Sequence, residues 1–212
     1  THIGILDKEY EAIGVEIKNS SKEVLDNCNL LTRVNCPTDD EILNLKDQTI
    51  LIGMLNPSKN QKKIKDILKK NINVFSLELL PRISRAQSMD VLSSQSNLAG
   101  YRAVVDSIYE FEKAIPMMMT AAGTVPAAKV LVIGAGVAGL QAIATAKRLG
   151  AIVSATDVRS ASKEQVESLG GKFLTVDQSE NLETKGGYAK EVSEDFKKKQ
   201  AEMMKDALKK ND

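Results

Sequence analysis

The feature that most constrains the fold is a set of three spaced glycines directly after an apolar segment. Residues 129–142 read KVLVIGAGVAGLQA, which is typical of a buried strand, a G-x-G-x-x-G turn and the start of a helix. In such a turn Gly134 permits the sharp bend, Gly136 lets the backbone approach a pyrophosphate, and Gly139 permits close packing of helix on strand. Val137, the first residue of the helix, is expected to lie against the dinucleotide. The pattern predicts a dinucleotide-binding α/β unit whose helix N-terminus faces the phosphates.

An acidic residue stands where this type of unit needs one. Asp157 follows the second strand and comes 23 residues after Gly134. A carboxylate at this place accepts both hydroxyl groups of the adenosine ribose and repels the 2′-phosphate of NADP, so NAD is the expected nucleotide. Val158 and Arg159 come next, and Arg159 is interpreted either as a stacking partner of the adenine or as a cation for a 2′-phosphate. A purely structural interpretation, a glycine turn with a capping Asp157, remains the alternative.

Hydrophobic periodicity predicts the other elements of this second domain, residues 129–212. We expect helices over 137–149, 163–169 and about 189–210, and strands over 130–133, 152–156 and 172–176. A complete doubly wound domain has about six strands. The second domain is therefore expected to be truncated at its C-terminus and the chain to be a piece of a longer protein. The N-terminus also opens without a full first strand–helix unit.

Residues 1–128 are interpreted as an N-terminal α/β domain with a connecting helix. We expect buried strands over 30–34, 49–55 and 73–79, surface helices over 39–45 and 60–70, and a long helix over 94–115 that Pro116 stops. The methionines at 117–119 are expected to pack against the long helix. The predicted fold class is α/β: two Rossmann-like domains joined by a long helix, the second a truncated doubly wound parallel-sheet domain.

Composition excludes several other kinds of site. Lys and Arg number 29 against 28 Asp and Glu, so no global field favours a nucleic acid or a membrane surface. One histidine, His2, and two cysteines, Cys28 and Cys36, are too few for a His/Cys zinc site or a Ser-His triad. The apolar runs are far shorter than the roughly 18–20 residues of a membrane-spanning helix. We therefore expect a soluble segment without metal or nucleic-acid partners, and two cysteines fit a reducing compartment.

A polar loop lies before the long helix. The sequence RISRAQSMD at 82–90 is followed by SSQSNLAGYR at 93–102 and by MMMTAAGTVP at 117–126. By sequence chemistry alone this stretch is either a binding loop at the end of a strand or a turn that caps a helix. Together with Gly134–Gly139, ATDVR at 155–159 and GGYAK at 186–190, it resembles the NAD(H)-binding component of proton-translocating NAD(P) transhydrogenases, in the alanine dehydrogenase/transhydrogenase superfamily.

The resemblance implies a head domain that binds NADH and passes hydride directly to NADP⁺ on a partner domain, coupled to proton movement through a membrane domain. It implies that the loop surrounds the nicotinamide and its ribose. Arg82 bonds the carboxamide or its ribose side, Gln87 reaches toward the partner nucleotide, and Asp90 and Ser93 fix the carboxamide. The residues that line the loop are Ile83, Ser84, Ser88 and Met89. Hydride transfer between nicotinamides needs no acid or base, so orientation is the main contribution of the protein.

The resemblance also implies a mobile lid at Gly187 and Tyr188 and a nucleotide contact at Gln200 on the helix after it. An ordinary flexible loop is the alternative for the lid. The family resemblance implies a homodimer and a position on the cytosolic or matrix face of a bacterial, mitochondrial or other organelle membrane, with no transmembrane segment in this chain.

Two other functions compete with this one. Alanine dehydrogenase shares the fold, but its reaction needs a lysine and a histidine near the nicotinamide. Here the corresponding strand ends carry Asn35 and Asn56. A non-catalytic module that senses NADH needs only the glycine turn and Asp157, so the loop around Gln87 and the lid favour turnover.

Overall fold

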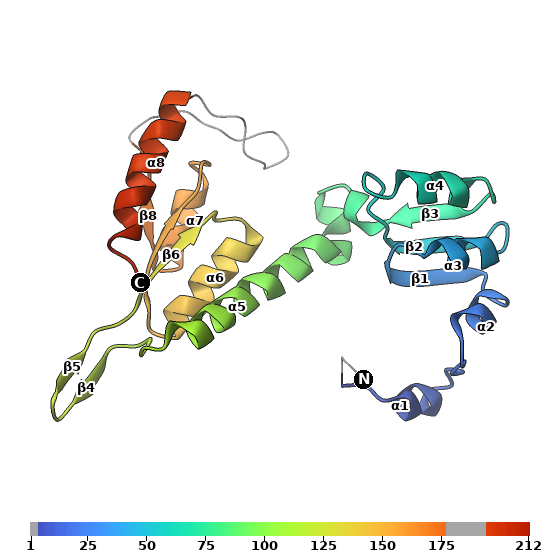
Figure 1. The fold of residues 1–212 in the computed structure, drawn as a ribbon, viewed down its shortest axis with the longest axis horizontal. Helices are drawn as coiled ribbons and strands as arrows, with labels where there is room; N and C mark the ends of the chain where they lie inside the picture. Colours follow the sequence, from blue (N-terminus) through green and yellow to red (C-terminus); the bar gives the residue numbers. More distant parts are fainter. Residues whose placement is uncertain (1–3, 177–193) are drawn as a thin grey trace. The chain divides into compact units, whose positions relative to one another are not determined.

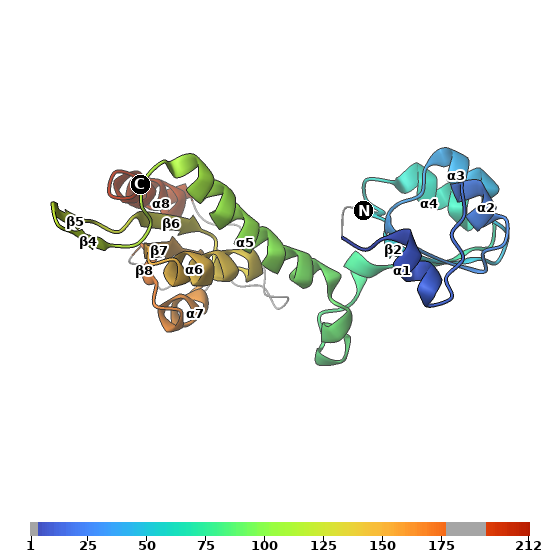
Figure 2. The same cartoon turned by 90° about the horizontal axis from the view of Figure 1, so that it is seen from below.

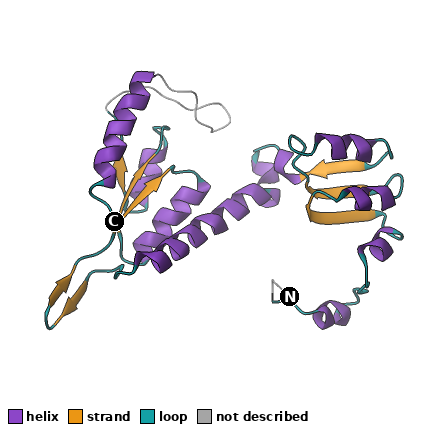
Figure 3. Ribbon diagram, viewed as in Figure 1, coloured by secondary structure: helices purple, strands orange, loops and turns teal. Residues whose placement is uncertain are grey.

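Two compact units make up the chain, Thr1–Val91 and Leu92–Asp212. The computed structural model describes residues 4–176 and 194–212. Each unit contains a three-stranded parallel sheet, shown by the strands in Figure 3. The division falls earlier than the boundary expected after residue 128, because Val104 and Ile108 of the long helix pack into the core of the second unit.

The first unit orders its strands β1-β2-β3 (Figure 1). The strands are β1 (Leu30–Asn35), β2 (Ile50–Met54) and β3 (Asn73–Ser76), followed by the short 3-10 helices η1 (Leu77–Leu79) and η2 (Ser84–Met89). The helices are α1 (Asp7–Ala12), α2 (Ser21–Leu25), α3 (Asp39–Asn44) and α4 (Gln61–Leu68). The strands and the helices α3 and α4 confirm the pattern predicted for this region, whereas α1 and α2 were not predicted.

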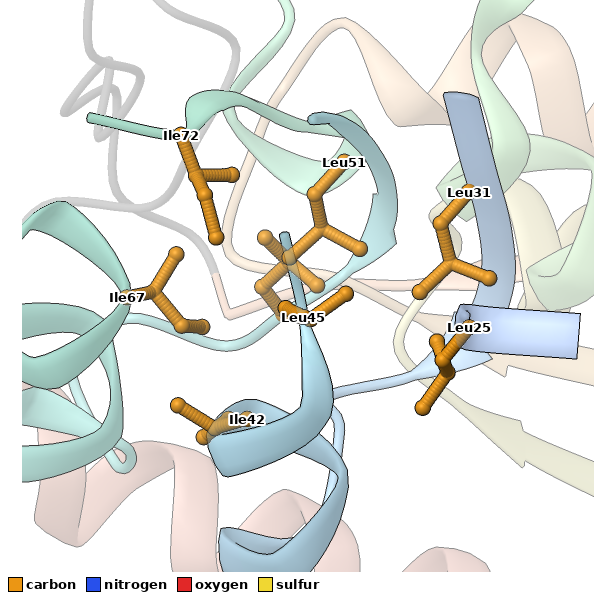
Figure 4. Close-up of a cluster of buried hydrophobic side chains, with 8 residues drawn as sticks. Leu25, Leu31, Ile42, Leu45, Leu51, Ile67 and Ile72 are labelled. Atoms are coloured by element: carbon orange, nitrogen blue, oxygen red, sulfur yellow. The ribbon is translucent and has the colours of Figure 1, made fainter. Parts of the chain in front are cut away.

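The core of the first unit lies on one face of its sheet. Figure 4 shows Leu31 and Leu51 of the sheet with Ile42 of α3 and Ile67 of α4 in one buried cluster. The register pairs Leu31 with Leu51, so both side chains lie on the same face. On the other face Leu30 and Phe75 are 51% and 57% exposed. The expectation of fully buried strands was therefore wrong for the outer strands, because the described helices supply apolar side chains to the opposite face.

The second unit orders its strands β6-β7-β8. They are β6 (Lys129–Ile133), β7 (Ile152–Thr156) and β8 (Lys172–Leu174), and the helices are α5 (Val91–Phe111), α6 (Val137–Arg148), α7 (Ser162–Ser168) and α8 (Glu194–Leu208). The alternation of strand and helix confirms the prediction from Lys129 onward. The start expected for the last helix, at about residue 189, lies outside the described residues.

Helix α5 packs closely against α6, which the two views in Figures 1 and 2 also show. A Cβ atom added at Gly100 would stand 2.0 Å from the carbonyl oxygen of Ala138, so only glycine permits this approach. The helix ends at Phe111, earlier than expected, because Glu112 takes a left-handed φ of 56° before Pro116 is reached. Among the described residues, no helix has both the length and the apolar character needed to cross a bilayer.

A hairpin of β4 (Met118–Thr120) and β5 (Gly123–Val125) follows α5 (Figure 1). Met117, Met118 and Met119 are 62%, 42% and 85% exposed. The expectation that these methionines pack against the long helix was therefore wrong. Residues 118–120 are extended in the hairpin, and all three of them are exposed.

Candidate nucleotide-binding site

The glycine turn joins β6 to α6 in the way that the sequence predicts. Gly134 has a left-handed φ of 91°, and its N–H donates to the carbonyl oxygen of Thr156 at 2.8 Å. A Cβ atom at Gly139 would stand 1.8 Å from the Gly134 carbonyl oxygen. Each of these two glycines is therefore required by the fold itself.

Gly136 is not required by the fold. Its φ of −77° and ψ of −167° are open to other residues, and a Cβ atom there would have Arg159 Nη2, 3.9 Å away, as its nearest neighbour. Glycine at this position leaves a space over the backbone that a Cβ atom would fill. Such a space fits the close approach of a pyrophosphate.

Helix α6 presents its N-terminus beside that space. Gly136 is the N-cap residue, so no side chain caps the N–H groups of the first turn, and the helix begins with the bond from Leu140 N to the Gly136 carbonyl oxygen at 2.8 Å. Val137 is 39% exposed at the first helical position. Free N–H groups and the positive end of the helix dipole are suited to an anion.

Asp157 lies at the carboxyl end of β7 and is fixed to the turn. Its Oδ2 accepts from Ala135 N at 2.7 Å, and its Oδ1 accepts from Arg159 N at 2.8 Å. Burial acts to raise the pKa of the Asp157 carboxyl, but the hydrogen bonds from Arg159 and Ala135 outweigh it, and the pKa lies below its usual range. The group is therefore a carboxylate at neutral pH, held beside the turn as a ribose-binding acid must be.

The Arg159 guanidinium makes a two-point contact with this carboxylate. Nε donates to Oδ1 at 2.9 Å and Nη2 donates to Oδ2 at 2.9 Å. The side chains of Asp157 and Arg159 are only 8% and 20% exposed. This pairing was not predicted, because the sequence interpretation directed Arg159 toward the adenine or a phosphate. The donor role of Ala135 was also missed, although its place between Gly134 and Gly136 in the motif marks it as part of the turn.

The loop before α5 forms the helix η2. Ile83, Met89 and most polar residues of this loop are exposed, and Ala86, 6% exposed, is its buried residue. The exposed residues here include the predicted Arg82, Ser84, Gln87 and Ser88, while Asp90 is half-buried. They belong to the first unit, whereas the glycine turn, Asp157 and Ser93 belong to the second. A joint role for the two sets remains a prediction.

The remaining predicted residues have different outcomes. Val158 is half-buried directly after Asp157, and Gln200 is half-buried on α8. The lid residues Gly187 and Tyr188 lie outside the described residues. The structure therefore joins Gly134, Gly136, Gly139, Asp157 and Arg159 by direct proximity, and leaves the other assignments as predictions.

Two further features bear on the kind of site. A cavity of about 650 Å³ lies between α5, β6 and the end of α8, but its lining is largely apolar and includes neither the glycines nor Asp157. In residues 4–176 and 194–212 no group of three His, Cys, Asp or Glu side chains is placed to hold a metal ion. The glycine turn with Asp157 is thus the site with ligand-binding chemistry that we consider below.

Comparison with known proteins gives consistent results. The family model "Alanine dehydrogenase/PNT, C-terminal domain" matches residues 103–212, and the corresponding N-terminal domain model matches residues 1–99. The chain is 54% identical over 215 residues to an NAD(P) transhydrogenase subunit alpha protein of Rhodospirillum rubrum, covering 98% of this chain and 56% of that protein.

Solved structures agree with this result. The crystal structure of transhydrogenase from Sinorhizobium meliloti matches with a TM-score of 0.77 and 53% identity, over 81% of this chain and 51% of that one. An L-alanine dehydrogenase matches with a TM-score of 0.68 over 82% of this chain and 49% of that one, but at 20% identity this likeness shows the fold alone. The chain spans about half the length of the relatives it matches. On the two domain models, which together cover nearly all of its residues, the chain belongs to the alanine dehydrogenase/PNT family.

Proposed function

We propose that the chain binds NAD(H) and forms the NAD(H)-binding part of a proton-translocating NAD(P) transhydrogenase. The observation that carries the proposal is the Asp157 carboxylate, fixed 2.7 Å from the Ala135 N–H of the glycine turn. Similarity to a protein named NAD(P) transhydrogenase subunit alpha supports the reaction. In this reaction hydride passes directly from NADH to NADP⁺ on a partner domain.

The second unit binds the adenosine and pyrophosphate part of the nucleotide. Asp157 accepts the hydroxyl groups of the adenosine ribose, and its negative charge disfavours the 2′-phosphate of NADP(H). The space over Gly136 and the N–H groups at the start of α6 receive the pyrophosphate. Val137 lies against the dinucleotide, and Val158 and Arg159 lie beside the adenosine.

The first unit orients the nicotinamide, which supplies the hydride chemistry when bound. Arg82, Asp90 and Ser93 hold the carboxamide and the ribose beside it. Ile83, Ser84, Ser88 and Met89 form the wall of this region, and Gln87 faces the partner nucleotide. Gly187 and Tyr188 close over the site, and Gln200 contributes a nucleotide contact from α8. Because no proton is transferred with the hydride, hydrogen-bond partners at fixed positions are sufficient.

The partners follow from this function. An NADP(H)-binding domain must present the second nicotinamide, and a membrane domain must couple the transfer to proton movement. A second copy of the chain forms a homodimer. The chain works at the cytosolic or matrix face of the membrane that holds the coupled domain, and it binds no nucleic acid.

Amino-acid oxidation is not favoured by the ends of β1 and β2. Asn35 and Asn56 stand where lysine and histidine are needed for that reaction. Asn56 has a left-handed φ of 48°, and its N–H donates to the Glu78 carboxylate. This strand end is therefore engaged in a turn that holds the chain ahead of α4.

Calorimetric titration of the 212-residue chain with NADH and NADPH tests the binding. We expect NADH to bind far more tightly than NADPH, and Asp157→Asn to narrow the difference because the repulsive charge is removed. Asp106→Asn is the matched control, since it also removes a carboxylate paired with an arginine but lies on the exposed side of α5. Equal affinities for the two nucleotides, or no binding of either, contradict the proposal.

Hydride transfer separates an enzyme from a sensor. With an NADP(H)-binding domain added, deuterium from labelled NADH is expected to appear in NADPH. NADH binding without any transfer identifies a sensing module instead.

A further inference from the structure

The carboxylate of Asp157 already has as many donors as a carboxylate accepts. Two are backbone N–H groups, from Ala135 and Arg159, and two belong to the Arg159 side chain, Nε and Nη2. A carboxylate offers about four lone-pair positions. A ribose with two hydroxyl groups therefore finds no acceptor position open on Asp157 in this conformation.

The two kinds of donor differ in how easily they leave. The N–H of Ala135 belongs to a residue that is 0% exposed inside the glycine turn, and the N–H of Arg159 belongs to the chain directly after β7. Neither moves without a change of the backbone. The guanidinium stands on a flexible side chain, so it is the donor that a ligand displaces.

The guanidinium also lies next to the space kept open by Gly136. Arg159 Nη2 is 3.9 Å from the position of a Cβ atom at Gly136 and 2.9 Å from Asp157 Oδ2. A single cationic group is thus placed between the acid that accepts ribose hydroxyls and the backbone that receives a pyrophosphate. A short rotation of this side chain is enough to exchange a carboxylate partner for a phosphate partner.

We propose that Arg159 is a displaceable occupant of the nucleotide site, which the ribose diol of the ligand removes from Asp157 and which then binds the pyrophosphate. The inference rests on the proposed NAD(H) site. Arg159 opposes the binding of a nucleoside, because the hydroxyl groups must replace its two donors. It assists the binding of a nucleoside diphosphate, because the released guanidinium gains a charged partner.

This dual role predicts effects of opposite sign in one variant. In Arg159→Gln, adenosine is expected to bind about fivefold more tightly than in the unchanged chain, whereas ADP-ribose is expected to bind about tenfold more weakly. The nucleoside 2′-deoxyadenosine lacks one of the two hydroxyl groups and is expected to gain less than adenosine. Amide-resolved NMR titration measures the weak nucleoside affinities, and calorimetry measures ADP-ribose.

Two further variants guard against trivial causes. Arg102→Gln removes an arginine from the exposed ion pair with Asp106 and is expected to change neither affinity. Arg159→Lys keeps the charge but loses the two-point geometry, so it is expected to bind adenosine more tightly and to retain most of its ADP-ribose affinity. The amide spectrum of each variant establishes that it is folded.

The outcomes are distinct. Weaker binding of both ligands to folded Arg159→Gln overturns the inference and assigns Arg159 a structural or adenine-stacking role. Unchanged adenosine affinity, or tighter binding of both ligands, also overturns it, because one of the two partners is then absent. If the unchanged chain binds neither NADH nor ADP-ribose, the proposed function fails as well, which the other results leave intact.

Discussion

Two alanine substitutions in the glycine turn are expected to separate folding from binding. In Gly139→Ala the new Cβ meets the Gly134 carbonyl oxygen at 1.8 Å, so α6 must move away from β6. Overpacking of this kind costs about 3 kcal/mol. Replacing glycine by alanine in a helix returns about 1 kcal/mol. We therefore expect a net loss of about 2 kcal/mol in the free energy of unfolding.

Gly136→Ala is the matched substitution in open space, since its Cβ has no neighbour nearer than 3.9 Å. Alanine is a poorer N-cap than glycine by about 0.5–1 kcal/mol. The smaller conformational freedom of the unfolded chain offsets about 0.4–1 kcal/mol of that loss. Stability is therefore expected to stay within about 0.5 kcal/mol of the unchanged chain. The methyl group stands where the pyrophosphate approaches, so NADH affinity is expected to fall about 30-fold.

Urea unfolding followed by circular dichroism measures the stability, and the fluorescence of bound NADH measures the affinity. The loss in Gly139→Ala corresponds to roughly 4–8 °C in thermal midpoint. Equal destabilisation by the two substitutions refutes the argument from backbone clearance. Unchanged NADH affinity in Gly136→Ala refutes the assignment of this turn to the pyrophosphate.

Three other predictions use the same measurements. Gly100→Ala places a Cβ 2.0 Å from the Ala138 carbonyl oxygen and is expected to lower the free energy of unfolding by about 2 kcal/mol, which a neutral result contradicts. The hydrogen bonds that depress the pKa of Asp157 contribute stability above the unfolded value of about 3.9 and lose it as the pH falls through the lower folded value. The difference in urea midpoint between the unchanged chain and Asp157→Asn must therefore shrink below about pH 4, and a difference that grows there contradicts this sign. In α4, Ile67→Ala removes a 0% exposed side chain and is expected to lower the stability of the first unit by about 2–4 kcal/mol, whereas Leu68→Ala, at a 56% exposed position, is expected to lower it by less than about 1 kcal/mol.

Much of the second unit was predictable because several signals agree there. The strand predicted at Ile152–Thr156 has the same bounds as β7, and α6 begins at the predicted Val137. An apolar run, a glycine turn and a helical period all specify the same arrangement in this region. The position of Asp157 beside the turn follows from that arrangement, because parallel strands end at the same edge of the sheet.

Other features depend on information that a local pattern does not contain. The two-point contact of Arg159 with Asp157 joins residues two positions apart, and spacing alone does not say whether the side chain turns back or points outward. The hairpin after α5 has strands of only three residues each, too short for an alternating pattern. Its turn residues, Ala121 and Ala122, are not the Asn-Gly or Asp-Gly pairs that mark hairpins. Its methionines therefore suggested burial on composition alone.

The exposed hairpin methionines give the chain a chemical label for that surface. Thioethers that solvent reaches are oxidised by dilute hydrogen peroxide to sulfoxides, each of which adds one oxygen atom to a peptide mass. Met119, at 85% exposure, is expected to react before Met118, at 42%. A partner chain that covers the hairpin slows this reaction without any substitution in the protein. The oxygen uptake of one short peptide thus reports whether the hairpin is covered in the assembled protein.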